Sequence, residues 1–173
     1  DGTVKIWEMP AIAYMSASHT IEGFSSPIES IAFSPDGTKI AAGMFDNSIR
    51  IWDVESGTLS QTLLGHTAPV RSIAYSPDGS LIASVSDDMK TVVWKTSDGS
   101  QLRSTGGHTD RVLTVAFSPD GTTIATGSAD ATIRLSRASD GTRLATLRDH
   151  KETVLSVVFS PDGKTLASTS MDH

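Results

Sequence analysis

Short apolar runs alternate with polar turns along the chain, and the pattern repeats every 42 residues. In the unit 65–102, one apolar run ends at Tyr75, a second spans 81–85, a third spans 91–94 and a fourth begins at Ser100. Short runs rich in β-branched and aromatic residues, without a helical period of 3.6, predict β-strands joined by tight turns. Each unit therefore predicts a four-stranded antiparallel sheet, and we expect no helix longer than about one turn.

The tetrapeptide Ser-Pro-Asp-Gly marks the phase of the repeat. Its four copies begin at Ser34, Ser76, Ser118 and Ser160, and an aromatic residue precedes each of them. Pro presets its backbone angle for a turn, the Asp side chain bonds the nearby backbone, and Gly supplies a left-handed position. A period of this length with four strands per unit is typical of the blades of a β-propeller.

The repeats resemble those of the WD40 family of β-propellers. The resemblance rests on Gly65-His66, on Val70 to Gly79, on Ile82 to Ser84 and on the Trp52-Asp53 pair, and it covers the whole chain. It implies an all-β propeller fold with four blades' worth of four-stranded antiparallel sheets in a single domain, 1–173. We expect the first blade at 24–64, the second at 65–105, the third at 107–147, and a fourth split between 149–173 and 1–18. Residues 149–173 would supply its first two strands and residues 1–18 its last two.

Each repeat offers a His, a Ser or Thr, and an Asp, which are the residue types of a hydrolytic triad. The sets are His66, Ser84 and Asp88 with Trp94; His108, Thr126 and Asp130; and His150, Ser168 and Asp172 (or Asp1) with Trp7. In the first repeat, Phe24 and Ala42 replace two of these residues.

The resemblance implies that these sets are buried structural chains of hydrogen bonds, from the Trp N–H to the hydroxyl, to His and to Asp. A structural device must recur in every repeat, whereas an active site needs one copy, and the chain has no nucleophile elbow of the G-x-S-x-G type. We therefore expect no catalytic residue and no enzyme activity. A propeller hydrolase with a site in its channel is the alternative. The third repeat carries Ser136 where the period predicts tryptophan.

The resemblance further implies a platform for protein or peptide partners, bound on the face formed by the loops before the first strands and the turns between the second and third strands. Candidate contacts on this face are Glu29, Phe45, Arg71, Met89, Arg111 and Lys151. Met44, Phe45, Met89 and Met171 are apolar at turn positions, which favours an exposed binding surface. Arg71, Arg111 and Lys151 either form a ring that captures an acidic or phosphorylated peptide or are separate solvated charges.

The amino-acid composition limits the classes of partner and ligand that we expect the chain to bind. The net charge is −6 and basic residues form no run, which argues against nucleic acid. The chain has no cysteine, so thiolate metal sites are excluded, and we expect no metal and no cofactor. It shows neither an apolar stretch of membrane-spanning length nor a targeting signal, so we expect a cytoplasmic protein without membrane contact.

The two ends of the sequence are complementary in phase. Strands at 3–8 and 11–18 of one chain can complete the blade begun by 154–170 of another, so two chains related by a two-fold axis would close a ring of eight blades. We therefore expect a homodimer. A fragment of a longer multi-repeat chain is the alternative.

Overall fold

The computed structural model describes residues 3–7, 17–22 and 26–173, and these residues form β-strands and turns without a helix. The strands are β1 (Val4–Trp7), β2 (Ala17–Ile21), β3 (Ile28–Phe33), β4 (Lys39–Met44), β5 (Ile49–Asp53), β6 (Leu59–Leu63), β7 (Val70–Tyr75), β8 (Leu81–Ser86), β9 (Thr91–Lys95), β10 (Gln101–Thr105), β11 (Val112–Phe117), β12 (Thr123–Ser128), β13 (Ile133–Arg137), β14 (Arg143–Leu147), β15 (Val154–Phe159) and β16 (Leu166–Ser170). The prediction of an all-β chain is confirmed.

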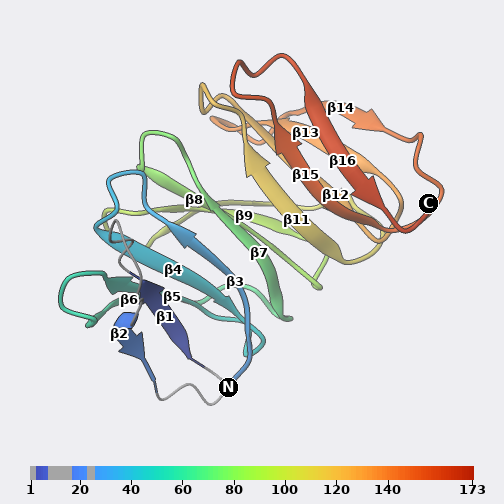
Figure 1. Cartoon of the computed structure of the whole chain (residues 1–173). Coiled ribbons are helices and arrows are strands. Elements are labelled where there is room, and N and C mark those ends of the chain that lie inside the picture. Colours follow the sequence, from blue (N-terminus) through green and yellow to red (C-terminus); the bar gives the residue numbers. More distant parts are fainter. Residues whose placement is uncertain (1–2, 8–16, 23–25) are drawn as a thin grey trace, which may run out of the picture.

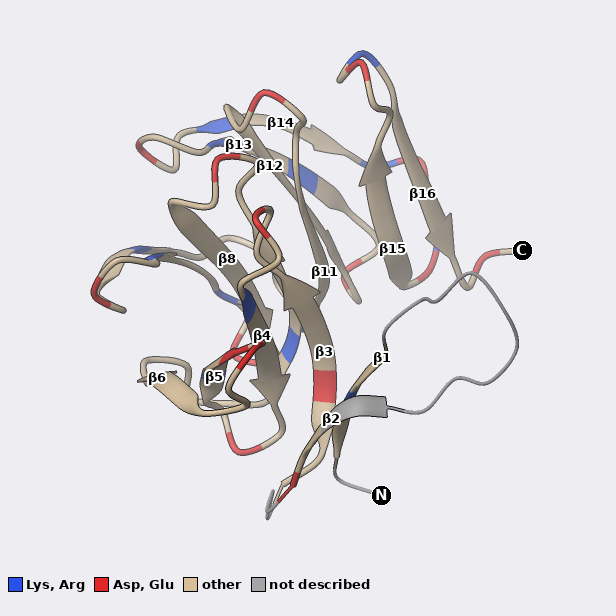
Figure 2. Cartoon of the chain, turned by 60° about the vertical axis from the view of Figure 1, so that its left-hand side comes forward, with Lys and Arg blue, Asp and Glu red and all other residues tan. Residues whose placement is uncertain are grey.

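The strands form three four-stranded antiparallel sheets with a two-stranded hairpin at each end of the series. We call β3–β6 the first sheet, β7–β10 the second sheet and β11–β14 the third sheet; β1–β2 is the N-terminal hairpin and β15–β16 the C-terminal hairpin. The sheets follow one another side by side (Figure 1), and in Figure 2 they trace an open arc with the two hairpins at its ends. The described residues therefore form consecutive blades and no closed ring.

The sheets pack face to face through apolar clusters that span neighbouring blades. One cluster joins Ile51 and Leu63 of the first sheet to Ile73, Ile82 and Trp94 of the second. The first strands lie next to one another around the inside of the arc, and the Ile73 amide donates to Ser30 Oγ at 3.3 Å across that boundary. The central strands β4, β8 and β12 are almost completely buried, because a sheet lies on each of their faces.

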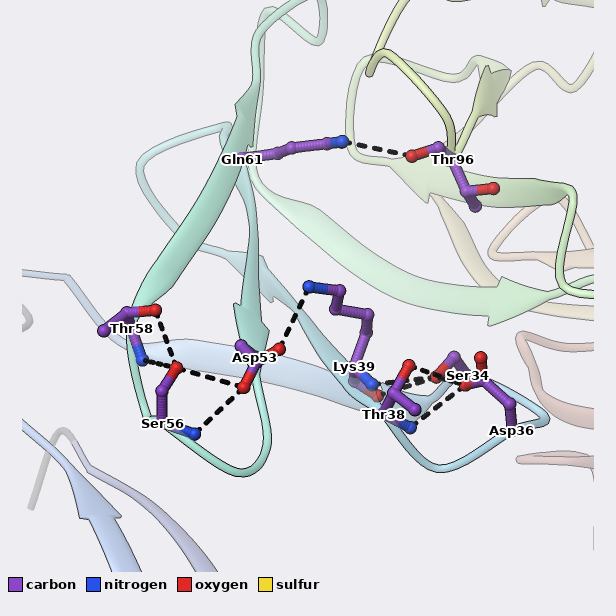
Figure 3. A network of polar contacts seen from close by, with 9 residues as sticks. All are labelled: Ser34, Asp36, Thr38, Lys39, Asp53, Ser56, Thr58, Gln61 and Thr96. Atoms are coloured by element: carbon purple, nitrogen blue, oxygen red, sulfur yellow. Dashed lines mark hydrogen bonds and ion pairs between the residues drawn. The ribbon is translucent and has the colours of Figure 1, made fainter.

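The Ser-Pro-Asp-Gly turns have the geometry that their residue types predict. In the first sheet, Ser34 Oγ donates to Asp36 Oδ1 at 2.6 Å and accepts the Lys39 amide at 2.9 Å, as Figure 3 shows. Gly37 has a φ of 72°, a left-handed conformation that favours glycine. The serine hydroxyl, and after it the backbone amide of Thr38, hold the pKa of Asp36 below its usual value. The same serine–aspartate bond of 2.6 Å recurs in the other three copies.

The N-terminal hairpin differs in position from the expectation. Its first strand, β1, lies where the sequence predicts it, but the strand paired with it is β2, whose bounds are Ala17–Ile21 rather than 11–18. Residues 8–16 lie outside the described part of the chain. Val4, Ile6 and Ile21 pack on the first sheet, so the hairpin is the neighbour of that sheet.

The described part of the chain contains no helix that is long and apolar enough to cross a membrane.

Candidate functional site

In the second sheet, the polar set predicted from the sequence is a continuous buried chain of hydrogen bonds. The indole Nε1 of Trp94 donates to Ser84 Oγ at 2.8 Å, Ser84 Oγ lies 2.8 Å from His66 Nε2, and His66 Nδ1 lies 2.8 Å from Asp88 Oδ2. Asp88 also accepts the backbone amide of Thr67 at 3.1 Å. The chain therefore ties strands β8 and β9 to the loop that leads into β7.

Burial and hydrogen bonding set the protonation of this chain. Burial lowers the pKa of His66, so its imidazole is neutral at pH 7. Burial acts to raise the pKa of Asp88, but the hydrogen bonds from His66 and the Thr67 amide outweigh it and keep that pKa below its usual value. An ionised Asp88 only accepts, so the imidazole hydrogen lies on Nδ1 and Nε2 accepts the Ser84 hydroxyl. Every polar atom along the chain has a partner.

We predict that acid destabilises the fold first through these histidines. The pKa values of His66 and His108 are lower in the folded chain than the ordinary 6.5, mainly because of burial. Below about pH 6.5 the unfolded chain therefore binds more protons than the folded chain, and the free energy of unfolding decreases as the pH is lowered. Urea unfolding at pH 7.5 and 5.0 measures the effect.

The double variant His66→Asn/His108→Asn is the control, because it should show a smaller difference between the two pH values. Equal or higher stability of the wild-type chain at pH 5.0 would contradict the prediction. Asp88 and Asp130 add a second, more acidic loss below about pH 3.8, since their pKa values are also lowered in the fold.

The third sheet keeps this chain without its indole. His108 Nδ1 lies 2.9 Å from Asp130 Oδ2, and His108 Nε2 lies 2.9 Å from Thr126 Oγ1. A Cβ built on Gly65 would meet the Trp94 ring at 2.8 Å, whereas one built on Gly107, the equivalent glycine, would meet the guanidinium of Arg134. Arg134 therefore occupies part of the space that the indole fills in the second sheet.

The remaining members of the predicted sets lie at the two ends of the arc. His150 Nδ1 lies 2.9 Å from Asp172 Oδ2, and His150 Nε2 lies 2.8 Å from Ser168 Oγ. Trp7 is half exposed on the N-terminal hairpin. Asp1 and Phe24 lie outside the described residues.

The Ser–His–Asp distances match those of a hydrolytic triad, but the surroundings do not favour that chemistry. Ser84 Oγ is fully buried and already accepts the Trp94 N–H, which leaves no path for a substrate to the hydroxyl. The same arrangement recurs in three repeats, as a structural element does. Among the described residues, no group of three or more His, Cys, Asp or Glu side chains is placed to hold a metal ion.

We call the face formed by the loops before the first strands and the turns between the second and third strands the loop face. On it, Arg71 forms ion pairs with other residues of the same chain. Its guanidinium contacts Asp87 at 2.6 and 2.9 Å, contacts Glu29 at 2.9 Å, and lies 5.7 Å from the ring centre of Phe45. The hydrogen bond with Asp87 raises the pKa of Arg71. Two carboxylates therefore neutralise the arginine that the sequence offered for capture of an acidic peptide.

Three of the four apolar turn residues are exposed and one is not. Phe45, Met89 and Met171 are between 44% and 50% exposed. The expectation of an exposed Met44 is wrong, because Met44 closes strand β4 and packs fully buried with Ile6 and Trp52 under the N-terminal hairpin. Lys151 and Arg111 are exposed, and Arg111 lies 3.9 Å from Asp110.

A serine that the sequence patterns did not single out supports the aspartate of each Ser/Thr–His–Asp set. Ser86 Oγ donates to the Ala68 carbonyl at 2.8 Å and accepts the Asp88 amide at 3.1 Å. Ser128 Oγ donates to the Arg111 carbonyl at 2.8 Å and accepts the Asp130 amide at 3.0 Å. The signal was available, since Ser86, Ser128 and Ser170 are spaced by 42 residues.

Comparisons with known proteins agree with the repeat geometry. The family model described as "WD domain, G-beta repeat" (WD40) matches residues 15–53, 57–95, 99–135 and 141–173. The vegetative incompatibility protein HET-E-1 of Podospora anserina is 46% identical over 43 residues, which is 25% of this chain and 3% of that protein. The WD repeat-containing protein 26 homolog of Arabidopsis thaliana is 39% identical over 57 residues, 33% of this chain and 10% of that protein.

A third relative, the WD repeat, SAM and U-box domain-containing protein 1 of Danio rerio, is 32% identical over 63 residues, 34% of this chain and 13% of that protein. The matched segments are thus between 3% and 13% of these relatives' lengths.

Proposed function

The chain belongs to the WD40 repeat family, and from that premise we propose that it is a non-enzymatic scaffold that binds a protein or peptide on its loop face. The main observation behind the proposal is that apolar side chains are exposed at turns of this face: Phe45 in the first sheet, Met89 in the second sheet and Met171 after the C-terminal hairpin, whereas the third sheet has Ala129 and Ala131 at its turn. Exposed apolar residues on neighbouring sheets, as Phe45 and Met89 are, mark a contact surface.

Arg71 supports this surface without serving as a free charge. It holds Glu29 and Asp87 and lies against Phe45, so it fixes the orientation of the aromatic ring. The partner therefore meets an apolar surface bordered by a neutralised arginine, with Arg111 and Lys151 as the exposed cations farther along it.

If the partner binds on this face, substitutions of its exposed apolar residues should selectively weaken peptide binding. An array of immobilised peptides of diverse sequence, probed with the labelled chain, identifies ligands, and Phe45→Ser/Met89→Ser should weaken the selected peptides about tenfold or more, because aromatic anchors dominate such contacts. Leu59→Ser is the matched control, since Leu59 is 53% exposed and begins β6, beside the β5–β6 turn at the end of the sheet opposite the binding face. Equal binding by the double variant and the wild-type chain would contradict the proposal.

The absence of enzyme activity is part of the same proposal. His150 and Ser168 are partly exposed, so this copy of the Ser–His–Asp set is the one a substrate could approach. We expect no hydrolysis of p-nitrophenyl acetate above that of heat-denatured protein. Hydrolysis that disappears in Ser168→Ala would contradict this part and favour the hydrolase.

The second part of the proposal is that two chains close an eight-bladed ring. Ile31 and Phe33 of the first sheet are more than half exposed, whereas Ile73, Val115 and Val157, the counterparts of Ile31, are buried against the preceding sheet. The first sheet therefore presents the face on which a preceding pair of strands would pack.

The C-terminal hairpin presents the matching face. Ala32, Ala74 and Ala116 each pack on the apolar cluster of the following sheet, while their counterpart Val158 is 58% exposed. Strand β16 also has a free edge, which is an association site.

The split polar set supports the same pairing. Ser168 Oγ contacts His150, and the indole that completes the equivalent chain in the second sheet has its counterpart in the half-exposed Trp7 of the N-terminal hairpin. A β1 strand beside β16 of a second copy would bring Trp7 to Ser168, and two such contacts close a symmetric ring. Further repeats of a longer chain would cover the same faces, which is the alternative.

A further inference from the structure

A cavity of about 630 Å³ lies between the second and third sheets, at the end of the strands opposite the loop face. It is lined by Leu81, Leu102, Arg103, Gly121, Thr122, Thr123, Arg137, Ala138, Ser139 and Leu144. The turns β11–β12 and β13–β14 contribute to it, whereas the turn β12–β13 belongs to the loop face. The cavity is thus separate from the surface proposed above. Its volume is within the range of small-ligand sites.

The groove at the equivalent place between the first and second sheets has a different character. It is lined by charged and polar side chains, among them Lys39, Ser60, Gln61 and Thr96 together with Asp36 and Asp78. One repeat later these four positions carry Leu81, Leu102, Arg103 and Ala138. The groove between the second and third sheets is thus more apolar than the groove between the first and second sheets, and it contains the guanidinium of Arg103.

Arg103 lacks the partner that Gln61 has. Gln61 Nε2 donates to the Thr96 carbonyl at 3.1 Å, the contact at the top of Figure 3, and so links the two sheets that form the first groove. Nη1 of Arg103 is buried and has no hydrogen-bond partner. The side chain of Arg103 is only partly buried and lines the cavity, so a ligand carboxylate there can accept from its guanidinium and gain affinity.

The substitution of tryptophan by Ser136 leaves polar groups next to this arginine. A narrow space of about 10 Å³, the room of roughly one water molecule, is lined by Thr126, Ser136, Arg103 and Arg137, and it shares both arginines with the larger cavity. Arg137 is paired with Asp140 at 2.9 Å. Among the described residues, the linings of the two spaces include no Asp or Glu, so the charge of Arg103 is not compensated there.

We propose that this cavity binds the C-terminal residue of a peptide that ends in a leucine-sized aliphatic side chain. The terminal carboxylate accepts from Arg103, and the side chain packs between Leu81, Leu102 and Leu144. A C-terminal residue carries a carboxylate and an apolar side chain on the same Cα, which is the combination that one guanidinium set in an apolar wall selects.

The test uses the tripeptide N-acetyl-Ala-Ala-Leu as the free acid and as its C-terminal amide, titrated up to about 10 mM into the ¹⁵N-labelled chain. We expect the acid to shift the amide signals of Gly121, Thr122 and Ala138 in a saturable way, and the amide form to bind about tenfold more weakly or worse. Arg103→Gln, which installs the residue found at position 61, should weaken binding of the tripeptide acid by a similar factor.

Arg111→Gln is the matched control, because it removes one exposed arginine on the loop face and should leave the tripeptide affinity unchanged. A dispersed spectrum of Arg103→Gln with the wild-type pattern shows that the variant is folded. Equal binding of acid and amide, unchanged binding by Arg103→Gln, shifts confined to other sheets or no binding at all would overturn the proposal. None of these results would affect the peptide contacts expected of Phe45 and Met89.

Discussion

Replacing Trp94 by serine, the residue that the third sheet carries at this position, is expected to lower the free energy of unfolding by about 3–5 kcal/mol. The indole is buried between the first and second sheets, where it packs with Ile51, Leu63 and Ile82. Its N–H is the donor to Ser84 Oγ. The variant therefore loses apolar contact and leaves a hole beside a polar hydroxyl.

Chemical denaturation followed by circular dichroism measures this loss. Ser84→Ala should lower the free energy of unfolding by about 1–3 kcal/mol, because it leaves the Trp94 N–H and His66 Nε2 without their shared partner. Ser136→Ala is the control at the equivalent position and should change stability by less than about 1 kcal/mol. A Trp94→Ser chain within 1 kcal/mol of wild type would contradict the structural role of the buried chain.

Replacing Ile31 by aspartate is expected to convert the proposed dimer into monomers. The side chain is exposed on the open face of the first sheet, whereas in the ring it would be buried as Ile73 is. A carboxylate buried there without a partner should weaken association about a hundredfold or more. Sedimentation equilibrium over a concentration series measures the dissociation constant.

Leu64→Asp provides the control, since Leu64 is more exposed than Ile31 and lies away from both end faces. It should leave the dissociation constant unchanged. The two-chain assembly would be disproved by an Ile31→Asp chain that associates as tightly as the control.

Most of the fold could be predicted from the period of 42 residues. Because each Ser-Pro-Asp-Gly turn and each apolar run recurs in phase, strand order and turn type were predictable for every repeat, and β3 to β16 lie where the pattern places them. The polar chain of His66, Ser84, Asp88 and Trp94 was predictable for the same reason, since its members recur at fixed offsets.

What the repeat does not encode was harder to predict. Met44 looked like an exposed turn residue but is buried, because the N-terminal hairpin packs over the first sheet. Arg71 looked like a free cation, yet Glu29, one repeat earlier, and Asp87 bind it across strands. Arg134 occupies space that tryptophan fills in the second sheet, and nothing in the local pattern of β13 signals it. These outcomes depend on side chains that meet between blades, and spacing along the chain does not reveal such contacts.

The mass of the chain in solution tests the proposed assembly most directly. Size-exclusion chromatography with multi-angle light scattering at micromolar concentration should give twice the chain mass of 18.2 kDa, with a circular dichroism spectrum of β-structure. That result is expected if Trp7 and β1 of one copy complete β16 of another. A folded, soluble species at the single-chain mass would contradict the eight-bladed dimer and favour a segment of a longer repeat protein.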